Sequence, residues 1–77
     1  MIKDLEDKHS NLTFNLKTIK RNKGLRGVIF KETRDLFPKV DRSSKIPQWQ
    51  QLVNLITDEI LEIEVELEQL KTKEYDN

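Results

Sequence analysis

The sequence predicts an all-α protein, either an antiparallel helical hairpin or a small three-helix bundle with a long C-terminal heptad helix that is expected to be oligomeric. The first observation is a regular apolar stripe in the last third of the chain, with alternating steps of four and three: Trp49, Val53, Ile56, Ile60, Ile63, Leu67 and Leu70. The first third repeats that rhythm with Ile2, Leu5, His9, Leu12, Leu16 and Ile19. The remaining observation is compositional. The 77 residues include only two glycines and two prolines, which argues against a turn-rich β domain. Heptad stripes are typical of helices that pack lengthwise against other helices.

The N-terminal stripe predicts a first helix over about residues 2–22. Gly24 suits the position just after this helix, because glycine tolerates the left-handed conformation that ends helices. Residues 10–15 include poor helix formers, and the apolar residues around Phe14 alternate as in a strand. A β-hairpin over about residues 11–31 is therefore the alternative. The heptad explains more of the apolar positions, so we favour the helix.

The middle of the chain predicts a short helix over about residues 26–37. It should end at Phe37, because a residue that precedes proline avoids the helical region. After a polar connection, Ser43 or Ser44 can cap the next helix, and Pro47 suits its first turn.

The C-terminal stripe predicts a long helix over about residues 46–74. At 1.5 Å per residue it is longer than the first helix by about two turns. Part of its stripe then needs cover from the middle segment or from another chain, which favours a homo-oligomer. Leu52, Leu55, Leu61 and Val65 lie off the stripe and suggest a second contact surface, for which Leu61 and Val65 are the interface candidates.

Composition points to one small domain over residues 1–77 without a cofactor. The chain has no cysteine and one histidine, so neither a disulfide nor a zinc site is expected. No stretch reaches the roughly 18 apolar residues of a membrane span, and we expect a cytoplasmic protein. The small, cysteine-free composition rich in lysine, glutamate and isoleucine has the character of a phage or mobile-element protein.

No residue pattern predicts catalysis. Glutamates at 62, 64, 66 and 68 point in different directions on a helix and do not converge on a metal ion. His9 lies in the apolar stripe, where a polar residue more often sets the register of packed helices than serves as a pH switch. The glycines lack the pattern of a phosphate-binding loop.

Charge is distributed unevenly although the formal net charge is zero. Residues 17–45 carry ten basic and three acidic side chains, a net charge of +7, whereas residues 46–77 carry two basic and eight acidic ones, a net charge of −6. Clustered cations at a helix end can bind phosphates or an acidic protein surface. The candidate partner or nucleic-acid contacts are Lys17, Lys20, Arg21, Lys23, Arg26, Val28 and Phe30.

These patterns predict a non-enzymatic helical interaction module that binds itself and another protein, as an inhibitor, adaptor or assembly factor. One alternative is a nucleic-acid-binding regulator that uses the basic segment 17–34. Overall neutrality makes it the second choice, because most nucleic-acid-binding domains are net basic. The other alternative is a purely structural oligomer.

Overall fold

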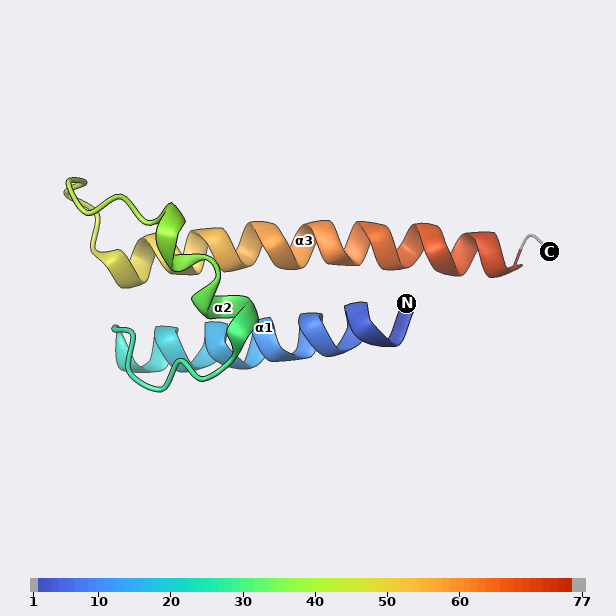
Figure 1. The fold of residues 1–77 in the computed structure, drawn as a ribbon, viewed down its shortest axis with the longest axis horizontal. Helices are drawn as coiled ribbons and strands as arrows, with labels where there is room; N and C mark the ends of the chain where they lie inside the picture. Colours follow the sequence, from blue (N-terminus) through green and yellow to red (C-terminus); the bar gives the residue numbers. More distant parts are fainter. Residues whose placement is uncertain (1, 76–77) are drawn as a thin grey trace.

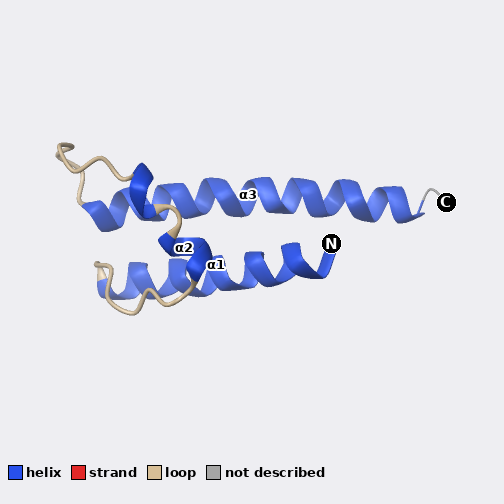
Figure 2. Cartoon of the chain, in the orientation of Figure 1, coloured by secondary structure: helices blue, strands red, loops and turns tan. Residues whose placement is uncertain are grey.

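The computed structural model describes the backbone of residues 2–75, and over that range the chain is helical with no strand (Figures 1 and 2). The elements are α1 (Ile2–Asn22), α2 (Lys31–Arg34), the 3₁₀ turn η1 (Phe37–Lys39) and α3 (Gln48–Tyr75). The all-α prediction is confirmed. The β-hairpin alternative over residues 11–31 is wrong, because residues 11–22 belong to α1. Within the described range, no helix has the length and apolar content needed to cross a bilayer.

The two long helices lie side by side and run in opposite directions (Figure 1). With 21 and 28 residues, α1 and α3 should measure about 32 and 42 Å at 1.5 Å per residue. The end of α1 and the start of α3 lie on the same side of the molecule, so the difference in length appears at the other side (Figure 1). There the C-terminal end of α3 extends past the N-terminus of α1 (Figure 1).

Both apolar stripes face the contact between α1 and α3. The buried core consists of Leu12, Ile19, Leu36, Leu52, Val53, Ile56 and Ile63. Leu36 comes from the connection between α2 and η1, so this connection forms a third wall. Leu52 lies off the heptad stripe and is nevertheless 0% exposed, in the same cluster as Leu36. Because Leu36 belongs to this cluster as well, α3 can bury residues on two adjacent faces although α1 is the only long helix beside it in the described chain.

The connection differs from the expected helix over residues 26–37, because only Lys31–Arg34 forms an α-helix there. Gly27 has a φ of +87°, and a Cβ at this position would lie 2.9 Å from Thr18 Cγ2. The loop thus approaches α1 too closely for a regular helix to begin at residue 26. Pro38 sits at the start of η1, where a missing amide donor costs nothing, so Phe37 begins a new turn instead of ending a helix.

The end of α1 also differs from expectation. Lys23, and not Gly24, adopts the left-handed conformation, with φ of 51°. This conformation costs a non-glycine residue roughly 1–2 kcal/mol. Asn22 Nδ2 donates to the Arg26 carbonyl at 3.0 Å, which ties the loop to the last turn of α1. The loop contacts, and not the intrinsic preference of one residue, determine where the helix ends.

Gln51 holds the connection that enters α3, whereas we expected Ser43 or Ser44 to cap this helix. Its Nε2 donates to the carbonyls of Asp41 (2.8 Å) and Ile46 (2.9 Å), and its Oε1 accepts from the Asp41 amide at 2.8 Å. The two serines instead bond within the loop, and Pro47 immediately precedes α3.

The hydrogen bonds from Ser43 to Asp41, first from its side chain and then from its backbone amide, lower the pKa of Asp41 below its usual value. Because this pKa is lowered on folding, its contribution to stability exists above the ordinary pKa and is lost as pH falls through the lowered one.

Candidate interaction surface

The basic end of the molecule is formed by the last two turns of α1 and the loop that follows it. Lys20 and Arg21 lie in the final turn of α1, and Lys23 and Arg26 lie in the loop. All four are exposed, as is Lys17 one turn earlier. We call these five residues the basic end. Two like-charged residues in the last turn also suit the negative pole of the helix dipole.

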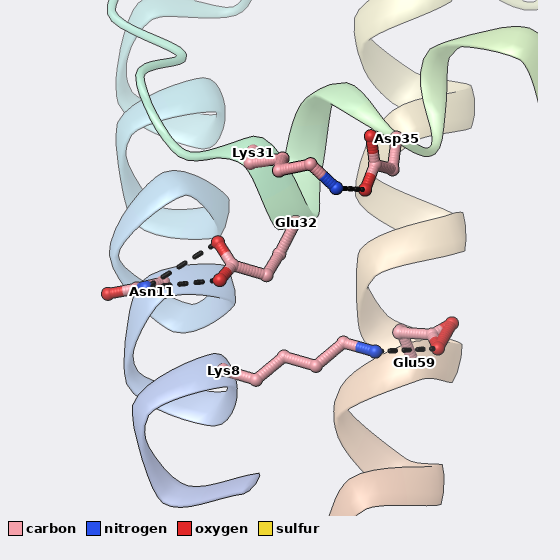
Figure 3. A network of polar contacts seen from close by, with 6 residues as sticks. All are labelled: Lys8, Asn11, Lys31, Glu32, Asp35 and Glu59. Atoms are coloured by element: carbon pink, nitrogen blue, oxygen red, sulfur yellow. Dashed lines mark hydrogen bonds and ion pairs between the residues drawn. The ribbon is translucent and has the colours of Figure 1, made fainter. Parts of the chain in front are cut away.

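No residue of the basic end forms an ion pair within the described part of the chain. The three acidic residues that follow the basic end in the sequence bond elsewhere. Asp35 pairs with Lys31 at 3.0 Å, and Glu32 accepts from Asn11 Nδ2 at 3.5 Å (Figure 3). Asp41 accepts from Ser43. The positive charge of the basic end is therefore not neutralised by its local carboxylates.

Asn15 positions the loop of the basic end. It lies in the middle of α1 and is 0% exposed. Its Nδ2 donates to the Gly27 carbonyl at 3.4 Å, and its Oδ1 accepts from the Phe30 amide at 3.3 Å. A buried amide that bonds two loop backbone groups fixes the path of residues 27–30 along α1. We did not predict this role from the sequence, where Asn15 could be recognised only as a poor helix former.

Exposed apolar side chains lie on the same segments. Phe14 is 55% and Ile29 is 60% exposed. Phe14 meets Phe30 edge to face, with ring centroids 5.8 Å apart and planes at 86°. Phe30 and Val28, two of the predicted contacts, are half-buried. Phe14 was missed as a surface residue, although its position off the heptad stripe was the available signal.

The residues of the α3 stripe differ clearly in exposure from Leu61 and Val65, the candidates for a second interface. Every stripe residue from Trp49 to Leu70 is buried or half-buried. Leu61 and Val65 are 54% and 56% exposed, and with Glu62, Glu66 and Gln69 they line a shallow depression. The structure therefore places these two side chains where a partner could contact them, well apart from the core.

Two polar pairs join the long helices. His9 Nε2 lies 3.0 Å from Glu64 Oε1, and Lys8 Nζ lies 3.8 Å from Glu59 Oε1 (Figure 3 shows the second pair). Both pairs join α1 to α3, as a residue that sets register would. Exposed pairs of this kind contribute about 0–1 kcal/mol. No group of three or more potential metal ligands occurs among the described residues.

Comparisons with protein-family models, with curated proteins and with solved structures gave no match to this chain.

Proposed function

We propose that this chain is a non-enzymatic, cytoplasmic interaction module that docks an acidic partner protein on its basic end, as an inhibitor, adaptor or assembly factor. The observation that carries the proposal is the coincidence of five exposed cations, unpaired within the described chain, with exposed Phe14 and Ile29. Protein interfaces combine apolar anchors, which supply affinity, with charges that steer the encounter.

The apolar anchors favour a protein over nucleic acid as the partner. A phosphate-binding surface needs cations above all, whereas Ile29 offers nothing to a phosphate backbone. An aromatic ring can stack on a base, but Phe14 is engaged edge to face by Phe30. The acidic C-terminal half of the chain would also repel a polyanion.

Charge reversal of the basic end tests the proposal. In K20E/R21E/R26E we expect affinity for the partner to fall about 100-fold, close to 3 kcal/mol at 1.4 kcal/mol per tenfold. Helix content by circular dichroism should fall only slightly, because each reversed charge at the end of α1 costs about 0.3–1 kcal/mol. The control K3E/K39E/K71E makes the same change in net charge at exposed cations away from the basic end.

The partner is first recovered from a nuclease-treated lysate on the immobilised chain, then purified and titrated by calorimetry. The control variant should bind like the wild type, and wild-type affinity should weaken with added salt, since charges beyond about 10 Å are screened at 0.1 M. Equal binding by a folded K20E/R21E/R26E would refute the proposal. A partner that is recovered from an untreated lysate but lost after nuclease treatment would favour the nucleic-acid alternative.

A further inference from the structure

Two exposed surfaces of this chain have complementary character. The first lies on α1, where Phe14 and Lys17 line a shallow depression with His9, Ser10 and Thr13, and Arg21 follows one turn later. The second lies on α3, where Leu61 and Val65 alternate with Glu62 and Glu66. We call them the α1 patch and the α3 patch. Phe14 in the α1 patch and Leu61 and Val65 in the α3 patch are more than half exposed, and the charges of the two patches have opposite sign.

The two patches cannot meet within one molecule. At about 100° per residue, Phe14 lies about 200° around α1 from the buried Leu12. By the same geometry, Val65 lies about 180° around α3 from the buried Ile56. Since α1 and α3 pack together around Leu12 and Ile56, Phe14 and Val65 face away from each other on opposite sides of the pair of long helices.

We propose that the α3 patch binds the α1 patch of a second copy of this chain. Charge complementarity selects this occupant: Lys17 and Arg21 of one copy would meet Glu62 and Glu66 of another. Pairing of two α3 patches would instead bring four glutamates together, which is repulsive. The patches have similar lengths along their helices, about 10 Å from Phe14 to Arg21 and about 8 Å from Leu61 to Glu66.

Such a contact is heterologous, because two different surfaces meet. A heterologous contact leaves one patch free at each end, so it builds chains or closes into rings. The basic end and the α1 patch share Lys17 and Arg21, so self-association competes with partner docking. The inference goes beyond the proposed function and is tested on the purified chain alone, so the two can fail separately.

Charge-swapped variants test the contact by light scattering over concentrations up to about 1 mM, the affinity range of weak interfaces. The wild-type mass should rise with concentration above the 9.2 kDa of one chain. K17E/R21E and E62K/E66K should each stay at the mass of one chain, because each puts like charges on both patches. An equimolar mixture of the two should associate again, since every contact then joins opposite charges.

Circular dichroism must show that both charge-swapped variants are folded. If either is unfolded, the single substitutions F14S and V65S, which change no charge, provide a second test, and each should weaken association. A wild type that remains a single chain throughout would overturn the inference. Association that survives both charge changes, or a mixture that stays monomeric, would overturn it equally, since the contact would then use another surface or no complementary charges.

Discussion

Replacing Ile56 by aspartate is expected to unfold the protein. Ile56 is 0% exposed at the centre of the contact between α1 and α3. Truncating a buried isoleucine to alanine already costs about 2–5 kcal/mol. Aspartate adds an unpaired charge with no buried cation to meet it. At roughly 0.05–0.15 kcal/mol per residue, a chain of this size has about 4–11 kcal/mol of stability in total. Helix content at 25 °C, measured by circular dichroism, should therefore collapse.

Val65→Asp is the matched control for this substitution. It introduces the same side chain into the same helix, in place of a β-branched apolar residue that is 56% exposed. We expect a change in unfolding free energy within about 0.5 kcal/mol, as for other surface substitutions. If both variants unfold, or neither does, the assignment of the inner and outer faces of α3 is wrong.

Asn15→Ala is expected to destabilise the chain and to release the loop of the basic end. The substitution leaves the Phe30 amide and the Gly27 carbonyl without their side-chain partner. An unsatisfied buried polar group costs about 1–3 kcal/mol, and both bonds are long, so we expect about 2 kcal/mol in all. At about 4–8 °C per kcal/mol, the melting temperature should fall by about 8–16 °C. Hydrogen exchange should show lost protection at the Phe30 amide in particular.

Thr33→Val provides the opposite case. Thr33 is also 0% exposed, but its Oγ1 has no hydrogen-bond partner among the described residues. Valine keeps the shape and removes the desolvated hydroxyl, so we expect a gain of about 1 kcal/mol. A melting temperature that falls in Thr33→Val would show that the Thr33 hydroxyl is hydrogen-bonded after all, and one that is unchanged in Asn15→Ala would show that Asn15 does not hold the loop.

Periodicity was sufficient to predict the long helices, because each buries one regular stripe against the other. The same reasoning separated the exposed Leu61 and Val65 from the stripe. It also placed His9 between the helices, where the structure shows its contact with Glu64.

The connection could not be predicted in the same way, because its shape depends on contacts between residues distant in sequence. Gly27 has a positive φ where the loop lies against Thr18, and Leu52 is buried in the same cluster as Leu36. From the sequence, Asn15 is only a weak helix former, because its two loop partners, the Gly27 carbonyl and the Phe30 amide, are known only from the structure. The basic end was visible in the sequence as a charge cluster. That its local carboxylates do not neutralise it could not be predicted, because this depends on their contacts in the fold, such as the pairing of Asp35 with Lys31.

Site-specific photo-crosslinking tests most directly whether the basic end is the docking surface. A photoreactive amino acid is placed at the 60% exposed Ile29 or, as control, at the exposed Asn54 on α3, in cells of the native host. We expect Ile29 to yield one nuclease-resistant protein adduct that disappears in the K20E/R21E/R26E background, with no such adduct from Asn54. An adduct from Asn54 alone, or one from Ile29 that survives charge reversal, would contradict the account.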